Sequence, residues 1–425
     1  MKGIETSFHK IKSRVLSSGL IELIISNMFI QLTALVTVIF LADLLDPKEI
    51  GFFRLLFAYF VFFQMLGLLG CNSSILKFCS ENIDDHLKIS RLLFFRQRSF
   101  VSSLLSSVIF NIYLYFYVDP ISASASYYMH IYTLSIPFAV YSLCSMALLQ
   151  SLKMVRTAAI TQGIIRASFL IFSIIGGILG GLEWVIYMTF VGYILGAFAL
   201  FIIINKSINI KSLVILDSGE KNTLKFHSYG MFFAGILGIL QQNIDFYMLG
   251  FLGASYSLIA SFGIAAILFN VGTVITGTIQ TVVSPFFSEN QDNKNWVRKR
   301  AVSFQLFLIP ISLIFGILMY FGLYALLKIG FFNEYQNILK YSVPVIFKYF
   351  IWSTFCILGA ALFSIGVVKE TLIHALVLII LNIILSYFSA LWYGIEFIIY
   401  IQPIIVFIQL IFCLYLFNRK TKVEI

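Results

Sequence analysis

Charged residues are scarce in this chain of 425 residues, because Asp, Glu, Lys and Arg together make up only 11% of it. An average soluble domain is about one quarter charged. Apolar residues make up 60% of the chain and aromatic residues 17%, with 45 Phe and 22 Tyr. A chain of this length with so little polar surface cannot be a soluble globular protein, and the composition indicates a polytopic membrane protein.

Cysteine and histidine are also few and dispersed. The five cysteines lie far apart without a Cys-x-x-Cys pair, and the five histidines are equally scattered. Disulfide frameworks and zinc sites need close or repeated spacing of these residues. The sequence therefore predicts neither a disulfide nor a metal site, and no cofactor.

Long apolar runs fill most of the chain. A bilayer core about 30 Å thick needs around 20 apolar helical residues, and lipid admits only helices or closed barrels. The runs are too long for barrel strands and show no sustained alternation. We therefore predict an all-α fold with twelve transmembrane helices. The predicted spans are 19–45, 52–76, 99–118, 128–149, 157–179, 185–204, 229–251, 257–283, 301–327, 341–366, 372–391 and 397–417.

The basic residues predict the orientation of these spans. With a cytoplasmic N-terminus, the inner segments hold 23 Lys and Arg and the outer segments hold three. This distribution follows the positive-inside rule and places both termini in the cytoplasm. The net charge of +10 is then explained by membrane topology, which argues against nucleic acid as a partner.

The spans fall into two sets of six. We predict an N-terminal bundle over 1–204, a cytoplasmic linker over 205–228 and a C-terminal bundle over 229–425. Segments 40–82 and 248–290 can be aligned, and both end in Ser-Glu-Asn. Six spans per half give parallel repeats, and secondary transporters bind their substrates near the midplane where such repeats meet. This organisation favours transport across the membrane.

Three basic residues fall inside predicted spans, namely Arg54, Arg166 and Lys348. A charge at the centre of a membrane helix costs roughly 2.5–3.5 kcal/mol, so such residues are functional candidates. Arg166 lies about 14 Å into its span and Lys348 about 11 Å. We expect these cations to line a hydrated cavity and to bind an anionic substrate. Arg54 starts its span and either joins them or pairs with Asp43 across the outer turn.

Polar residues at helical spacing mark two further faces. Gln241 and Asp245 are four residues apart in the seventh span, and Gln31 stands on a similar polar face in the first. We expect Gln31 and Gln241 to contact substrate, and Asp245 and Asp43 to couple transport to a cation. The alternative for the amides is hydrogen bonding between packed helices, and for Asp245 a structural salt bridge.

At several motifs the chain resembles the Wzx-type (O-antigen) polysaccharide repeat-unit flippases of the multidrug/oligosaccharidyl-lipid/polysaccharide exporter superfamily. The turn Asp46–Gly51 matches the family's L-x-P-x-E-x-G pattern, and Ile244–Gly250 in the seventh span is similar to the family. Pro285 and the basic segment Lys294–Arg300 also fit. The resemblance covers essentially the whole chain.

The resemblance implies a flippase of the bacterial inner membrane that acts in lipopolysaccharide synthesis. Its substrate would be an undecaprenyl-pyrophosphate-linked oligosaccharide, moved from the cytoplasmic to the periplasmic leaflet by alternating access. Coupling to H⁺ or Na⁺ is implied as well, with the polysaccharide polymerase and the chain-length regulator as further partners. Arginine suits this substrate because its guanidinium binds phosphate in a bidentate manner.

Two other functions stay open at this point. A cation-coupled multidrug antiporter of the same superfamily would need acidic residues in its cavity, and here deep cations outnumber deep acids. A membrane polymerase or glycosyltransferase would need sizeable loops that carry catalytic groups. The longest predicted outer loop, 328–340, has about thirteen residues, so we do not expect an enzyme.

Overall fold

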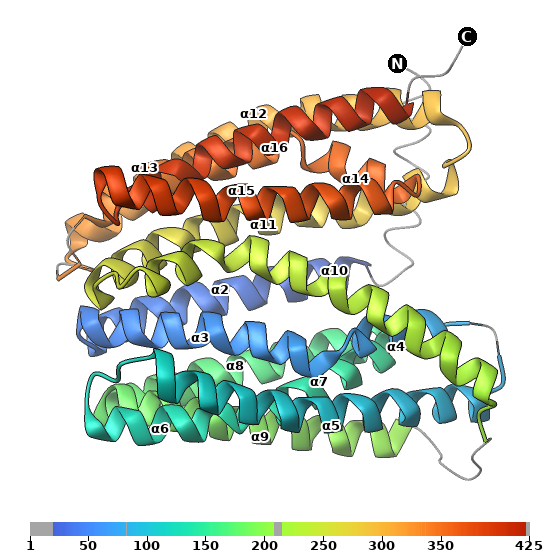
Figure 1. The fold of residues 1–425 in the computed structure, drawn as a ribbon, viewed down its shortest axis with the longest axis horizontal. Helices are drawn as coiled ribbons and strands as arrows, with labels where there is room; N and C mark the ends of the chain where they lie inside the picture. Colours follow the sequence, from blue (N-terminus) through green and yellow to red (C-terminus); the bar gives the residue numbers. More distant parts are fainter. Residues whose placement is uncertain (1–19, 82, 208–214, 333, 336, 422–425) are drawn as a thin grey trace. The chain divides into compact units, whose positions relative to one another are not determined.

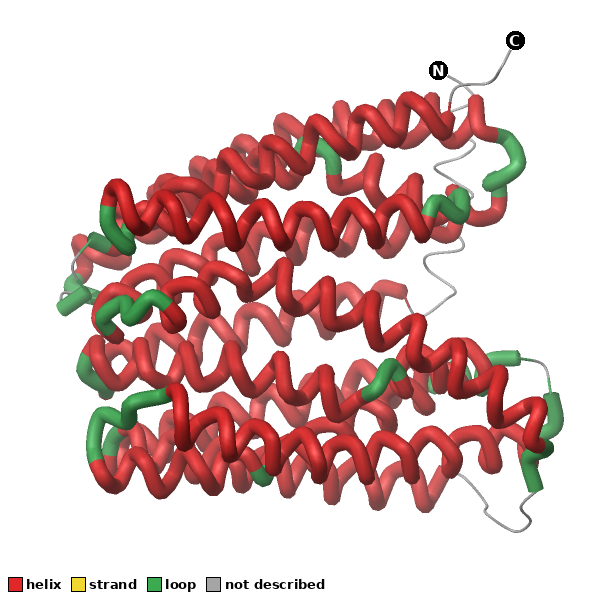
Figure 2. Tube along the Cα trace, viewed as in Figure 1, coloured by secondary structure: helices red, strands yellow, loops and turns green. Residues whose placement is uncertain are grey.

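The computed structural model describes residues 20–81, 83–207, 215–332, 334–335 and 337–421. Within these residues the chain forms fifteen α-helices and no strand, which confirms the predicted all-α class (Figures 1 and 2). Every predicted span lies on one helix or on two helices separated by a short break. The first nine helices are α2 (Leu20–Leu44), α3 (Pro47–Leu68), α4 (Cys71–Phe78), α5 (Asp85–Tyr117), α6 (Ala123–Thr133), α7 (Ser135–Ser151), α8 (Val155–Gly180), α9 (Leu182–Ser207) and α10 (Ser218–Phe251). The remaining six are α11 (Tyr256–Glu289), α12 (Lys294–Ile329), α13 (Ile338–Ser353), α14 (Cys356–Ser364), α15 (Val368–Tyr393) and α16 (Phe397–Thr421).

Most of these helices are long and apolar enough to cross a bilayer. In the described part of the chain nine spans qualify, and a tenth is formed by α13 and α14, which are bent by 41° at their break. The two other predicted spans lie on α2, whose described apolar part is Thr33–Leu44, and on α10. The polar run Gln241–Asp245 lowers the hydropathy of α10, although its 34 residues are more than enough to span the membrane.

The chain divides into two compact units, which we call the N-unit and the C-unit. The N-unit comprises the described residues of 16–45 and 52–240, and the C-unit comprises 46–51 and 241–421. α10 is continuous across residues 240 and 241, so its first part belongs to the N-unit and its second part to the C-unit. Residues 218–228 of the predicted linker are the first turns of this helix.

Three predicted spans, 52–76, 128–149 and 341–366, are each split into two helices, which the apolar pattern did not predict. In the second span, Leu69 and Gly70 have φ angles of 46° and 68° and end α3. In the fourth span, Pro137 has no N–H to donate to the Thr133 carbonyl, which starts a new helix at this point. The Ser107 hydroxyl on α5 instead donates to that carbonyl at 2.7 Å.

The Asp46–Gly51 motif has a clear physical basis in the C-unit. Pro47 starts α3, where a missing N–H costs nothing, and the Glu49 carboxylate accepts from the Asp46 N–H at 3.1 Å in the manner of a capping box. A Cβ atom on Gly51 would lie 1.7 Å from the carbonyl oxygen of Tyr256. The glycine is therefore required by the close approach of α11.

Candidate functional site

A polar groove runs along α11 and α14 in the C-unit. Its volume is about 680 Å³, within the range of about 300–1,000 Å³ usual for ligand pockets. Among the described residues that line it, none is charged. They are Gly277, Gln280, Ser284, Ser288, Ala360, Phe363 and Ser364.

Helical spacing produces the polar floor of this groove. Gln280, Ser284 and Ser288 are four residues apart and lie on one face of α11. The Ser284 hydroxyl donates to the Gln280 carbonyl at 2.7 Å, and the Ser364 hydroxyl donates to the Ala360 carbonyl at 2.9 Å. Because these hydroxyl hydrogens are used within the helices, the oxygen lone pairs can accept hydrogen bonds from a ligand. The groove thus suits a neutral ligand rich in hydroxyl groups.

The break between α13 and α14 lies beside the groove and is stabilised by two glutamines. Gln305 on α12 donates to the Ser353 carbonyl at 2.6 Å and accepts from the Ile357 N–H at 3.0 Å. Gln280 donates to the Cys356 carbonyl at 2.7 Å. Backbone groups freed by a broken membrane helix must find such partners, and discontinuous helices often line substrate sites in transporters.

Lys348 and Asp245 form a buried ion pair within the C-unit. The Lys348 Nζ lies 2.6 Å from the Asp245 Oδ2, and the two side chains are only 15% and 5% exposed. The ammonium also lies 5.4 Å from the centre of the Phe269 ring. The sequence suggests Lys348 as a ligand of an anionic substrate and Asp245 as a ligand of a cation. In this structure each neutralises the other, in agreement with the salt-bridge alternative for Asp245.

A small polar cavity of about 30 Å³ adjoins this pair, and it is large enough for one or two water molecules. Lys348 and Gln241 line it, so the structure brings together two of the predicted substrate residues. The Asp245 Oδ1 is buried with no hydrogen-bond partner in the described part of the chain. Amides from α15 and α16 complete its polar wall, namely Asn382, Gln402 and Gln409.

Arg166 and Arg54 both lie in the N-unit. Arg166 is exposed on α8, and its charge acts on the Tyr193 hydroxyl of α9. No described carboxylate forms an ion pair with Arg166. Arg54 is half-buried on α3.

The two remaining predicted residues stand on α2. Asp43 is exposed near the end of this helix. Gln31 falls on a part of α2 whose side chains lie outside the described residues.

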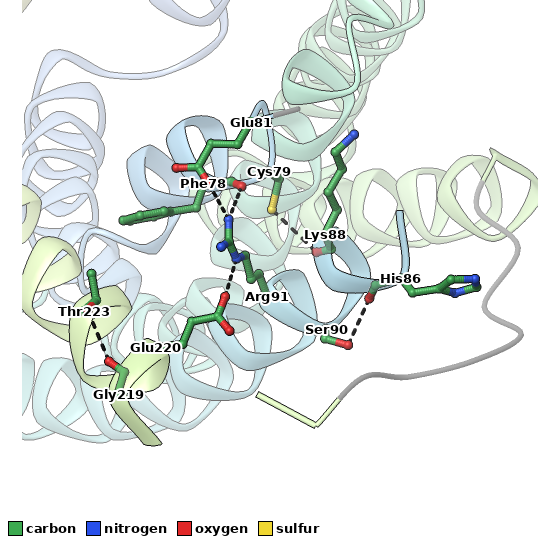
Figure 3. A network of polar contacts seen from close by, with 10 residues as sticks. All are labelled: Phe78, Cys79, Glu81, His86, Lys88, Ser90, Arg91, Gly219, Glu220 and Thr223. Carbon is green, nitrogen blue, oxygen red and sulfur yellow. Dashed lines mark hydrogen bonds and ion pairs between the residues drawn. The ribbon is translucent and has the colours of Figure 1, made fainter. Parts of the chain in front are cut away.

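A second network joins three helices of the N-unit around Arg91 (Figure 3). Its guanidinium donates to Glu81 at 2.6 Å, to Glu220 at 2.7 Å and to the Phe78 carbonyl at 2.9 Å. Arg91 lies on α5, Phe78 ends α4, and Glu220 lies in the first turn of α10. This network attaches the start of α10 to the N-unit.

The groove residues escape detection in the sequence because no single one of them is unusual in a membrane helix. The available signal was the recurrence of Gln280, Ser284 and Ser288 at intervals of four on one apolar helix. Gln305 was missed for a different reason. Its importance depends on a helix break that the apolar pattern does not reveal.

The fold resembles those of known transporters. A solved structure entitled "Lipid II flippase MurJ, inward closed conformation" matches with a TM-score of 0.72 and 17% identity, over 92% of this chain and 86% of the other. A second, of the "MATE multidrug transporter DinF-BH", matches with a TM-score of 0.63 and 15% identity, over 97% of both chains. At these identities the likeness concerns the fold.

No curated protein sequence matches this chain. Residues 16–291, about two thirds of its length, match a family described as "Polysaccharide biosynthesis protein". The match includes the Asp46–Gly51 turn, the polar run of α10 and the polar face of α11. The chain is therefore a member of this polysaccharide biosynthesis protein family.

Proposed function

We propose that this protein is a flippase for lipid-linked oligosaccharides. It moves undecaprenyl-pyrophosphate-linked repeat units from the cytoplasmic to the periplasmic leaflet of the bacterial inner membrane by alternating access, and it is not an enzyme. Membership of a polysaccharide biosynthesis family and a fold shared with transporters support this class of function. The polymerase and the chain-length regulator would receive its product.

The observation that carries the proposal is the uncharged groove of α11 and α14. A glycan presents many hydroxyl donors and no charge that must be neutralised, and the serine oxygens of the groove can accept from such donors. A drug cation would instead need an unpaired carboxylate. The groove has none, and Asp245 is already paired with Lys348. This argues for a glycan over a cationic drug.

The pyrophosphate of the substrate needs a cation inside the membrane, because a bare double charge would not cross a medium of low dielectric constant. Arg166 is our candidate, since it is exposed at the middle of α8 without an ion pair to any described residue. Arg54 is a further candidate on α3. Lys348 would contribute only in a state where its bond to Asp245 opens.

The proposal is tested by complementation of a deletion strain. We expect Arg166→Ala and Ser284→Leu to accumulate lipid-linked repeat units and to lose surface polysaccharide, although both proteins are inserted at normal levels, because the Ser284 hydroxyl donates only to a carbonyl of its own helix. Gln97→Leu, on an exposed position of α5, is the matched control and should complement fully. Normal polysaccharide with Arg166→Ala would remove Arg166 from the mechanism. Raised drug resistance on overexpression, without a polysaccharide defect on deletion, would favour the multidrug antiporter.

A further inference from the structure

Arg98 on α5 has an unusual environment within the N-unit. Its guanidinium carbon lies 5.7 Å from the centre of the Phe94 ring and 5.0 Å from that of Tyr229 on α10. The Nη1 atom is buried with no hydrogen-bond acceptor among the described residues, whereas the side chain as a whole is half-buried. Part of the side chain therefore reaches the surface of the protein. No described carboxylate forms an ion pair with Arg98, so its charge is available to an anion from outside the chain.

The surface next to Arg98 is apolar on one side. Arg98 directly precedes the predicted span 99–118, which places it at the cytoplasmic boundary of the membrane. Val101 and Leu105 follow on the same face of α5 and are exposed, and Phe233 is exposed one turn beyond Tyr229 on α10. A hydrocarbon chain could lie along these three side chains while its anionic head meets Arg98.

We propose that the seam of α5 and the first part of α10 binds an anionic glycerophospholipid of the cytoplasmic leaflet. Arg98 binds the phosphodiester, because a guanidinium can offer two parallel N–H donors to two phosphate oxygens. Phe94 and Tyr229 hold the guanidinium plane in place through cation–π contacts.

Lys225 sets the headgroup preference of this site. It is exposed one helical turn before Tyr229, on the cytoplasmic side of the proposed phosphate position. A headgroup ammonium, as in phosphatidylethanolamine, would be repelled there, whereas the glycerol of phosphatidylglycerol would not. Arg98 directly precedes its predicted span, whereas Arg166, the candidate for the pyrophosphate, lies about 14 Å into its own span. The site is therefore distinct from that of the proposed lipid-linked substrate.

Native mass spectrometry of the purified full-length protein tests this site directly. With phosphatidylglycerol or phosphatidylethanolamine added to the detergent micelles, the unaltered protein should retain phosphatidylglycerol preferentially. Arg98→Gln should weaken this retention about tenfold or more, because charge-assisted hydrogen bonds are lost. Arg298→Gln removes the same charge from a half-buried position of α12 in the C-unit and should change nothing.

Three results would overturn the proposal. The first is unchanged retention of phosphatidylglycerol by Arg98→Gln, and the second is equal retention of the two phospholipids by the unaltered protein. The third is displacement of phosphatidylglycerol by a polyprenyl diphosphate that itself requires Arg98, which would assign the site to the transport substrate. If Arg98→Gln does not fold, Arg98→Lys and Tyr229→Leu carry the test, and both should lower retention. Since the readout is lipid binding, it does not depend on transport activity.

Discussion

The Lys348–Asp245 pair concentrates two opposite charges inside the C-unit, where neither is well solvated. Removing one partner leaves the other charge buried and unmatched, whereas removing both leaves no charge to compensate. The pair is 103 residues apart in the sequence but only 2.6 Å apart in space. Its behaviour on mutation should therefore be strongly non-additive.

We predict that Asp245→Asn and Lys348→Met each destabilise the protein by about 3–5 kcal/mol, as breaking a buried ion pair usually does. The double variant should be more stable than either single variant. Thermal unfolding in detergent of the unaltered protein, the two single variants and the double variant forms a double-mutant cycle that measures the coupling between the two charges. If the stability losses of the two single variants add up in the double variant, the two charges act independently. That result would contradict the contact at 2.6 Å.

A second prediction concerns pH and His227 on α10. Its Nδ1 lies 3.0 Å from the Ser74 hydroxyl, and burial together with the nearby Lys77 charge lowers the pKa of His227 below its ordinary value of 6.5. The folded protein therefore holds this imidazole neutral more strongly than the unfolded chain does. The stabilisation is fully present above the ordinary pKa and is lost as the pH falls below it.

We expect acidification from pH 8 to pH 5.5 to lower the melting temperature of the unaltered protein more than that of His227→Gln. Gln keeps a polar group near Ser74 but cannot titrate, and the comparison cancels the other titrating groups. An equal fall in melting temperature for the unaltered protein and His227→Gln would mean that His227 does not contribute to the pH dependence.

Sequence reasoning identified Lys348, Asp245 and Gln241 as unusual polar residues within membrane spans. In the structure Lys348 and Gln241 line one cavity, and Asp245 is bonded to Lys348. It could not pair Lys348 with Asp245, because the pairing depends on how α10 and α13 pack. In the sequence, Arg98 is one of the 23 basic residues of the predicted cytoplasmic segments, and nothing there sets it apart from the others. What distinguishes it is the pair of aromatic rings around it, and Tyr229 comes from a helix far away in the sequence.

At the scale of elements, broken helices depend on neighbouring side chains. Gln305→Leu would leave the Ser353 carbonyl and the Ile357 N–H without partners in an apolar environment. Unsatisfied buried groups cost about 1–3 kcal/mol each, so we predict a large fall in thermal stability. Gln97→Leu, at an exposed position, serves as the control and should have little effect. Equal stability of Gln305→Leu and the unaltered protein would mean that the break does not rely on Gln305.

The turn into α3 gives a sharper prediction. Gly51→Ala would place a methyl group 1.7 Å from the Tyr256 carbonyl oxygen, so backbone must move and little folded protein should be recovered. Gly238→Ala in α10 is the matched control, because a Cβ there meets nothing within 4 Å. That change should even stabilise the helix slightly, by about 0.5–1 kcal/mol. Size-exclusion chromatography of both detergent-solubilised proteins measures the folded fraction.

The elements were largely predictable, because apolar runs of membrane length leave the backbone no alternative to a helix. All twelve predicted spans fall on helices in the described chain. The interruptions were not predictable from hydropathy. The break before α7 follows from Pro137 and the end of α3 from Gly70, but such residues also occur within unbroken helices, as Pro310 and Pro403 do here.

At the scale of the whole molecule, fold and composition establish a membrane protein with a transporter fold, and the family match adds polysaccharide biosynthesis. Substrate identity cannot be predicted from hydropathy, because it depends on which polar side chains face the substrate. In our proposal, the uncharged groove of α11 and α14 is the feature that connects this fold to a glycan. Filling the groove with a larger side chain at Ser284 should therefore abolish transport without unfolding the protein.

Reconstitution into proteoliposomes tests the flippase proposal most directly. Lipid-linked oligosaccharide would be supplied in the inner leaflet, and its arrival in the outer leaflet would be followed with an added glycosidase that cannot cross the membrane. We predict that the unaltered protein exposes the glycan over time, whereas Ser284→Leu and Arg166→Ala leave it protected. Continued protection of the glycan with the unaltered protein, in vesicles that contain correctly folded and inserted chains, would contradict the proposed function.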